Sequence, residues 1–307
     1  MSSKFGSQNR NFSFVKKARI FFIFSLIITV LGIATLAIFG LNYGVDFRAG
    51  SSVDIALKQD LSGRKAEIEQ FLQEGGFGTP VLTIGSDRIT MRFDEELKDD
   101  KEKALKEGFA QKFDKHASME INTVDAGMAR ELQFNALKAL GIASIGIIIY
   151  VAIRFEWRFG VAAIIGIMHA AFFVISMFSI LQLEVTLTFI VAVLTIVGYS
   201  INDTIVIFDR IRENMRFAKL KTTEDLIKLV DDSIWQTLRR SINTVVTVVI
   251  CALSLFLFGS ESIKLFSLAI LFGLICGAYS SIFIASPLWV WLKSKQKKAA
   301  AKSPAAS

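Results

Sequence analysis

Six long apolar runs, separated by polar segments, dominate the hydrophobic pattern of this chain of 307 residues. They cover residues 20–39, 136–153, 160–181, 187–208, 241–258 and 265–292. Each is close to or above the ~18 apolar residues that a helix needs to cross a bilayer. The pattern predicts a polytopic α-helical membrane protein with six transmembrane helices, and the mean hydropathy of +0.49 agrees with that prediction.

The first apolar run follows a basic start, as the apolar core of a secretory signal peptide does. This run is about twenty residues long and no A-x-A cleavage pattern follows it, whereas a signal peptide has an apolar core of ~7–15 residues. We therefore interpret it as an uncleaved first membrane span.

Residues 40–130, between the first two runs, have the pattern of a small soluble domain. Period-two alternation and helical spacing succeed one another in the order strand, helix, strand, strand, helix, strand. The predicted strands are 52–58, 81–84, 88–93 and 119–124, and the predicted helices are 63–74 and 98–113. The order βαββαβ is that of an inserted ferredoxin-like α+β domain.

Charge divides the chain along the same boundaries. The formal charge is +7 overall, but residues 41–130 hold 13 Lys and Arg against 17 Asp and Glu. The basic residues elsewhere gather in the tail 1–19, the turn 154–158, the connecting loop 209–240 and the tail 293–307. The positive-inside rule places these segments, and so both termini, in the cytoplasm. The domain at 40–130 is then extracytoplasmic, spans two to six lie within 131–292, and the basic segments need no nucleic acid to explain them.

Residue types that carry catalysis or bind metals are sparse. Cys251 and Cys276 lie in apolar runs, where packing explains them better than a disulfide or a metal site. His116 is the only histidine of the predicted soluble domain. No Ser/His/Asp set and no glycine-rich phosphate loop accompanies it. We therefore expect no enzyme activity, no metal and no cofactor.

Two charges lie where the pattern predicts membrane. Asp203 is about 17 residues from the outer end of the fourth run, and Arg240 is about 18 residues from the outer end of the fifth. Antiparallel spans place them at similar depth. A charge at the bilayer centre costs ~2.5–3.5 kcal/mol on insertion scales, so such residues usually pair or line a polar path. Two simpler interpretations stay open: Arg240 snorkels into lipid headgroups, and Asp203 bonds to Ser200 or Thr204.

Polar residues repeat with helical period around both charges. The stripe in the fourth span is Thr188, Ala192, Thr195, Tyr199, Asn202 and Asp203, and that in the fifth is Gln236, Arg240, Asn243, Thr244, Thr247, Cys251 and Ser254. A carboxylate beside an arginine stays ionised, whereas a desolvated one takes up a proton. The pattern favours a proton relay formed by Asp203 and Arg240. Tyr199, Asn202, Asn243 and Thr244 are the predicted supporting polar path.

Small residues recur in the sixth run. Gly273 and Gly277 form a G-x-x-x-G pattern there, which is typical of a helix that packs closely on another helix.

Four stretches resemble, in the right order, motifs of the SecD/SecF family of protein-export membrane proteins, on the SecF side of that family. They are GVDFRAG at 44–50, GYSINDTIVIFDRIREN at 198–214, QTLRRSI at 236–242 and GAYSSIFIAS at 277–286. The resemblance covers nearly the whole chain, and the motif at 198–214 is the most specific. Two departures stand out: Ala49 replaces a usual glycine, and Ala170 follows His169 where many relatives have Asp. The proton path lacks that Asp if relatives use it, and we interpret His169 as a buried neutral histidine bonded to a neighbouring helix.

The resemblance implies a subunit of the Sec protein translocase in the bacterial cytoplasmic membrane, built like half of a resistance-nodulation-division transporter. It implies an obligate SecD partner, and it implies the SecYEG channel and the SecA motor as neighbours, with YajC and YidC as further candidates. Exported unfolded polypeptides and membrane lipids complete the implied contacts. It further implies that the proton-motive force drives a late, ATP-independent stage of translocation, in which Asp203 and Arg240 take part. In the matching motif, Gly44 and Gly50 are expected to permit a turn where the first span meets the soluble domain. Asp46 either binds locally there or contacts the partner, and the structural role is favoured.

Two other functions stay open at this point. A proton-driven exporter of small molecules or lipids from the same superfamily would need a larger outer domain with a ligand cleft. A purely structural translocase module would keep its function after Asp203→Asn.

Overall fold

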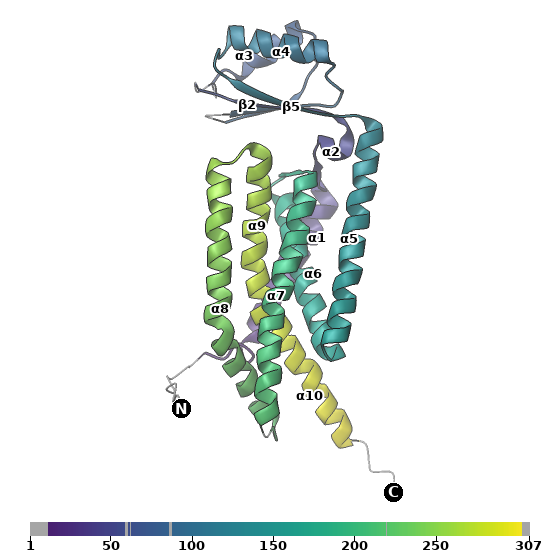
Figure 1. Ribbon diagram of the computed structural model, residues 1–307, viewed down its shortest axis with the longest axis vertical. Helices are drawn as coiled ribbons and strands as arrows, with labels where there is room; N and C mark the ends of the chain where they lie inside the picture. The colour runs from purple at the N-terminus through teal and green to yellow at the C-terminus, as the bar shows by residue number, and fades with distance from the viewer. Residues whose placement is uncertain (1–11, 59–60, 62, 86–87, 219, 303–307) are drawn as a thin grey trace. The chain divides into compact units, whose positions relative to one another are not determined.

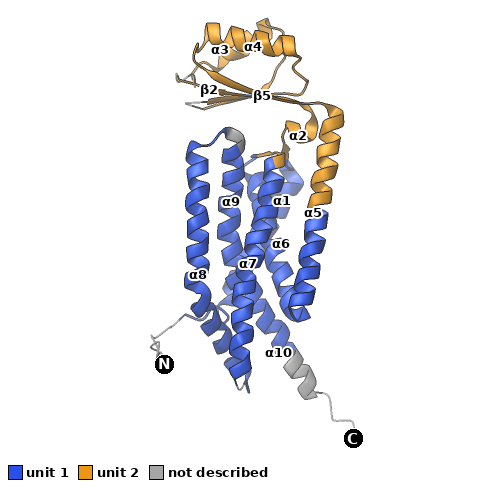
Figure 2. Cartoon of the chain, viewed as in Figure 1, with its two compact units in different colours: residues 1–41, 141–183, 188–307 blue, residues 42–140, 184–187 orange. Residues whose placement is uncertain are grey.

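The computed structural model describes residues 12–58, 61, 63–85, 88–218 and 220–302, and these divide into two compact units (Figures 1 and 2). Unit 1 comprises residues 1–41, 141–183 and 188–307, and unit 2 comprises residues 42–140 and 184–187.

Unit 1 is a bundle of long helices. They are α1 (Ala18–Phe39), the second part of α5 (Ala126–Arg154), α6 (Trp157–Ile180), α7 (Leu187–Phe217), α8 (Thr223–Phe258), α9 (Glu261–Ser280) and α10 (Ser286–Lys302). In the described chain six spans are long and apolar enough to cross a membrane, the sixth combining α9 and α10. The predicted polytopic helical fold is thereby confirmed.

The sixth span changes its helical winding halfway. Ser281–Ala285 form a π-helical turn, η1, between α9 and α10. The Ser286 hydroxyl donates to the carbonyl of Ser281 at 2.9 Å. Such π-turns inside α-helices are rare and frequently accompany functional sites.

The segment 209–240, which we predicted as a connecting loop, is mostly helical. α7 continues to Phe217 and α8 begins at Thr223, so only a short connection separates them. Thr222 and Asp225 form a capping box at the start of α8, which fixes where that helix begins. The charges of this segment lie on helix faces rather than in an irregular loop. A high density of charged residues is common to loops and to solvent-exposed helices, so charge alone did not distinguish the two.

Aromatic packing joins the helices at this end of unit 1. The Phe159 ring of α6 stacks on the fully buried Trp289 of α10, with ring centroids 4.4 Å apart. The N-terminal segment, residues 12–17, joins the same core through the buried Phe14. The buried Asp231 of α8 fixes this segment, because it accepts hydrogen bonds from the Ser13 hydroxyl and, at 3.1 Å, from the Val15 amide.

Unit 2 contains a four-stranded antiparallel sheet in the order β3-β4-β2-β5. The strands are β2 (Gly50–Ala56), β3 (Val81–Ile84), β4 (Arg88–Phe93) and β5 (Ser118–Val124). α3 (Lys65–Glu74) and α4 (Asp99–Lys112) cover one face of the sheet (Figure 1). Ile55, Ile89 and Met91 of the sheet meet Ile68, Leu72, Leu105 and Phe109 of the helices in a fully buried core. The predicted inserted βαββαβ ferredoxin-like domain is confirmed, because strand, helix and pairing order all agree.

A second, smaller pairing closes unit 2. β1 (Asn42–Tyr43) pairs in parallel with β6 (Glu184–Val185), and the short helix α2 (Val45–Arg48) follows β1. Two segments that are far apart in the sequence, one following α1 and the other following α6, are therefore held together.

Candidate functional site

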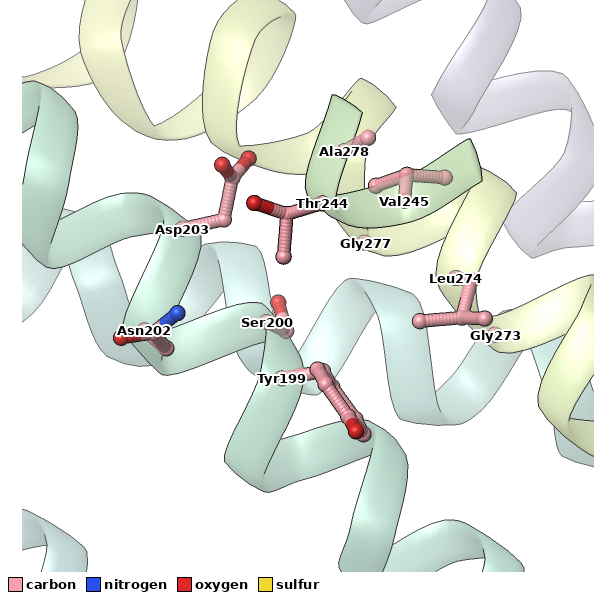
Figure 3. A pocket seen from close by; sticks show the side chains of 10 residues that line it. All are labelled: Tyr199, Ser200, Asn202, Asp203, Thr244, Val245, Gly273, Leu274, Gly277 and Ala278. Carbon is pink, nitrogen blue, oxygen red and sulfur yellow. The ribbon is translucent and has the colours of Figure 1, made fainter. Parts of the chain in front are cut away.

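Asp203 opens into a small pocket between three helices of unit 1. Its lining comes from α7 (Tyr199, Ser200, Asn202 and Asp203), from α8 (Thr244 and Val245) and from α9 (Gly273, Leu274, Gly277 and Ala278) (Figure 3). The internal space available to water is about 20 Å³, and a void of ~10–15 Å³ on this measure is enough for one water molecule. The pocket is therefore large enough for a water and too small for an organic ligand.

The carboxylate of Asp203 is not held in an ion pair. Its Oδ2 atom is buried and has no hydrogen-bond partner in the described chain, and the same holds for the hydroxyls of Ser200 and Ser241. Arg240 and Ser241 are adjacent on α8, and the positive charge of Arg240 is near enough to attract the carboxylate. Among the described residues no nitrogen of Arg240 lies within the 4.0 Å that defines a salt bridge to Asp203. A buried polar atom without a partner is costly. The carboxylate oxygen is therefore suited to accept a hydrogen bond from a water molecule, to bind a proton, or to pair with a cationic side chain that moves toward it.

Two glycines of α9 bring that helix against α7. A Cβ atom at Gly273 would overlap the side chain of Ile196, and one at Gly277 would lie 3.4 Å from the Cβ of Ser200. The small-residue pattern thus lies where α9 packs against α7, and it forms one wall of the Asp203 pocket.

The predicted polar path is only partly gathered in the pocket. Tyr199, Asn202 and Thr244 line it together with Asp203, whereas Arg240 and Asn243 do not. Apart from Asp203, which is half-buried, all of these side chains are exposed at the surface of the isolated chain. Exposed amides and hydroxyls on membrane-spanning helices are unfavourable against lipid, so the polar face of α7 and α8 is better suited to contact with protein or water than with lipid.

The predicted polar path did not include the hydroxyls of Ser200 and Ser241, although Ser200 was considered as a hydrogen-bond partner of Asp203. Ser200 precedes it by one helical turn, and Ser241 follows Arg240 directly. Helical spacing from Asp203 points to Ser200, because residues three or four positions apart share a helix face; Ser241, next to Arg240, does not follow from that spacing.

A second missed feature links α7 to the π-turn. The Thr204 hydroxyl donates to the carbonyl of Ser200 at 2.9 Å and lies 2.8 Å from the hydroxyl of Ser281. Thr204, directly after Asp203, is thus joined to η1. Neither Thr204 nor Ser200 donates a hydrogen bond to the Oδ2 atom of Asp203.

His169 of α6 is bonded to a neighbouring helix, as we interpreted it. Its Nδ1 atom lies 2.8 Å from the hydroxyl of Ser280, while its Nε2 atom is buried without a partner in the described chain. The Cys276 sulfur lies 3.8 Å from the same Nδ1.

The 44–50 motif lies in unit 2 and makes local contacts. Asp46 accepts hydrogen bonds from the amide of Leu187 at 2.8 Å and from the side-chain amide of Asn122 at 3.4 Å. Gly50 has φ +123°, and a Cβ there would overlap the carbonyl oxygen of Phe93. These contacts favour a structural role for the motif.

Ala49 has an unusual backbone conformation. Its φ is +66° and its ψ is 159°, a region that glycine adopts readily and other residues almost never. The alanine that replaces the usual glycine of this motif therefore stands where glycine fits best.

A carboxyl group beside this motif is also perturbed. Burial raises the pKa of the Glu184 carboxyl, and the opposing attraction of Arg92 is the smaller effect. Glu184 belongs to β6 and lies outside the membrane-spanning helices.

Comparison with known proteins assigns the family. Residues 103–295 match the family model described as protein export membrane protein SecD/SecF, C-terminal, and residues 35–60 match the SecD/SecF GG motif. The chain is 41% identical over 302 residues to the protein translocase subunit SecF of Alicyclobacillus acidocaldarius, which covers 96% of this chain and 97% of that protein. It is 35% identical over 295 residues to SecF of Rickettsia bellii, over 93% of this chain and 95% of that protein. The chain belongs to the SecD/SecF family of protein-export membrane proteins.

Some relatives are much longer than this chain, which matches only one region of them. The chain is 42% identical over 292 residues to the protein translocase subunit SecDF of Bacillus subtilis, but it spans only 39% of that protein. The crystal structure of SecDF from Thermus superposes with a TM-score of 0.81 at 34% identity, over 92% of this chain and 39% of that one.

Proposed function

We propose that this chain is an accessory subunit of the Sec protein translocase and couples proton movement through the membrane to the late, ATP-independent passage of exported proteins. Its family membership supports the translocase assignment. The observation that carries the proton step is the buried, unpartnered oxygen of Asp203 in a water-sized pocket between three membrane helices of the described chain.

Asp203 is the group that takes up and releases the proton. An ionised carboxylate in the membrane costs ~2.5–3.5 kcal/mol unless a partner or water compensates it. Arg240 lies on the next helix and attracts the carboxylate electrostatically without forming a salt bridge to it. An approach of Arg240 favours the ionised form, and its withdrawal favours protonation. Ser200 and Thr244 border the space through which a water would deliver the proton.

A SecD-type subunit is the proposed cover for the polar face of α7 and α8. Asn202, Arg240 and Asn243 are exposed on that face in the isolated chain. In single-chain relatives named SecDF, the region similar to this chain is 39% of the protein, so the remainder is large enough to supply the cover. The assembly would assist the SecYEG channel and the SecA motor, and YajC and YidC are further candidate neighbours. The proposed location is the cytoplasmic membrane with both termini inside the cell.

Export of a secreted reporter in cells depleted of the native subunit tests this proposal. The cells are complemented with the wild type, with Asp203→Asn or with Arg240→Met, at matched membrane levels. Asp232→Asn is the control, because Asp232 is an exposed aspartate on α8 away from the pocket. We expect export to fall to the depleted level with Asp203→Asn and to stay normal with Asp232→Asn.

A normal export rate with Asp203→Asn would refute the proton step, since the amide has nearly the same shape as the acid but carries no charge. A purely structural translocase module would then be the better assignment. Proton uptake by vesicles that contain the variant distinguishes a lost relay from a lost assembly.

A further inference from the structure

Two segments of unit 2 that lie far apart in the sequence are fastened together. Residues 42–46 follow α1, and residues 184–187 lead from α6 into the start of α7. The β1–β6 ladder pairs them, and the amide of Gly44 extends the pairing by donating a hydrogen bond to the carbonyl of Val185 at 2.9 Å. We call these two segments the clasp. It ties the connection that precedes α7 to the segment that follows α1.

Two carboxyl groups strengthen the clasp, one from each segment. The carboxyl group of Glu184 accepts a hydrogen bond from the amide of Val45, the first residue of α2. Asp46 accepts a hydrogen bond at 2.8 Å from the amide of Leu187, the first residue of α7. The first amides of a helix have no partner within that helix. The clasp therefore satisfies the amide at which α7 begins and helps to fix that start.

A glycine makes room for the carboxyl group of Glu184. A Cβ atom at Gly44 would overlap the Oε1 atom of Glu184, so an alanine there would push the carboxyl group aside. The φ of Gly44 is −74°, which any residue adopts, so space rather than backbone freedom is the reason for glycine here. The Glu184 side chain is thereby held half-buried, and burial disfavours the charged form of a carboxyl group.

The charges that act on Glu184 come from three elements of unit 2. Arg92 of β4 attracts the ionised carboxylate, whereas Asp54 of β2 and Asp46 of α2 repel it. Burial is the largest effect and raises the pKa of the Glu184 carboxyl, and the two like charges raise this pKa further. The attraction of Arg92 and the hydrogen bond from the Val45 amide oppose the rise without cancelling it. The closed clasp therefore favours the protonated form of its own carboxyl group.

We propose that the clasp is a proton-operated latch for the start of α7, closed while Glu184 carries a proton and loosened when Glu184 is ionised. An ionised carboxylate in this position is poorly solvated and lies near two like charges, whereas opening the clasp exposes it to water. The latch itself depends only on contacts within unit 2. Its role rests on the proposed function, which places the clasp on the outer side, where the proton-motive force supplies protons. Proton uptake by Glu184 then holds the first residue of α7, the helix that carries Asp203.

Hydrogen exchange measured by mass spectrometry tests the latch on the full-length chain in lipid nanodiscs. The observable is the protection factor of peptides that span residues 184–187 and the first turn of α7, because this ratio removes the intrinsic pH dependence of exchange and reports local opening. We expect it to fall about tenfold for each pH unit between the ordinary pKa of glutamate and the raised pKa of Glu184, and then to level off. A protection factor that stays constant over this range would overturn the proposal.

Two variants of the clasp assign the response to Glu184. Glu184→Gln keeps an oxygen that accepts from the Val45 amide but has no proton to lose, so its protection factor should keep the low-pH value of the wild type at every pH. Gly44→Ala pushes the carboxyl group toward water, so the fall with pH should shrink. Thermal unfolding verifies that each variant is folded. If protection in Glu184→Gln still falls with pH, or the fall in Gly44→Ala is unchanged, the proposal is wrong.

A neighbouring charge distinguishes a proton latch from a purely structural contact. Asp54→Asn removes a like charge but keeps the oxygen that accepts from the Thr90 hydroxyl at 2.7 Å, so the pKa of Glu184 is raised less and the total fall in protection should be smaller. Glu107→Gln is the control, because Glu107 is an exposed residue of α4 on the helix-covered face of the sheet. Equal falls in Asp54→Asn and Glu107→Gln would refute the latch. Asp203→Asn should keep the full pH response, so a failure of the proton step in the export test and a failure of the latch are separate results.

Discussion

Replacing Ala49 with glycine is expected to stabilise unit 2. At φ +66° and ψ 159° a residue with a side chain stores ~1–3 kcal/mol of backbone strain. Glycine removes this strain but loses ~0.5–1 kcal/mol through the greater freedom of the unfolded chain. The methyl group of Ala49 packs partly against the Val45 and Val124 cluster, and its loss costs a fraction of the ~0.8 kcal/mol of a buried methylene. The net expectation is that the free energy of unfolding of unit 2 increases by about 1 kcal/mol. An increase, rather than a decrease, is the result that tests the strain at Ala49.

The control for this change is Ala56→Gly. Ala56 is an exposed residue of β2, where glycine has no strain to relieve and should destabilise by ~0.5–1 kcal/mol. Pulse proteolysis of the full-length protein across a urea series gives the midpoint of unfolding for unit 2. The midpoint should rise with Ala49→Gly and fall with Ala56→Gly. If both substitutions lower it, the backbone at Ala49 is not strained and the reasoning fails.

Three further substitutions test other parts of the structure. Gly273→Leu should separate α9 from α7 and lower the melting temperature in detergent. Gly277→Ala should be tolerated, because the added Cβ would lie at an ordinary contact distance from the Cβ of Ser200. Equal effects of the two substitutions would contradict this account of the packing. Glu184→Gln should stabilise unit 2 at neutral pH. Burial raises the pKa of the Glu184 carboxyl in the folded protein, so the stability of the wild type falls as the pH rises from the ordinary glutamate pKa through the raised one. Urea midpoints measured across pH should fall for the wild type and stay level for this variant; parallel curves would contradict it. Asp231→Ala should release the N-terminal segment, because each hydrogen bond to the carboxylate contributes ~1.5–3 kcal/mol. Trypsin should then cut that segment faster in this variant than in the control Asp232→Ala. Equal cleavage rates would mean that Asp231 does not hold the segment in place.

The membrane spans and the βαββαβ order followed directly from the sequence. Apolar runs of this length form membrane helices and little else in a chain of this composition, and strand alternation in residues 52–58 is hard to mistake for a helix. The boundaries were less accurate, because helices such as α8 continue beyond the apolar run into charged residues. The Thr222 and Asp225 capping box marked the true start of α8, but charge density obscured it.

The candidate site was less predictable than the fold. Asp203 stands out in any hydropathy plot, and helical spacing suggested Tyr199, Asn202 and Thr244 as neighbours. The sequence did not indicate that Arg240 would remain outside the pocket, because the rotation of α8 about its axis depends on packing with α9. The π-turn at Ser281–Ala285 was also invisible, since it adds no residue type that an α-helix would exclude.

One wall of the Asp203 site is closely packed, whereas Arg240 on α8 is exposed. The glycines of α9 let that helix pack closely on α7, because a Cβ atom at Gly273 would overlap the side chain of Ile196. Arg240 is exposed on α8 and has no such constraint. A proton relay needs a carboxylate at a fixed position and a cation whose distance can change, because only the changing distance alters the affinity for the proton. The chain supplies the fixed carboxylate, and a subunit that covers α8 is the element able to set the position of Arg240. Under the proposed function, the proton affinity of Asp203 is therefore a property of the assembled complex, and reconstitution of the chain alone should give no proton flux.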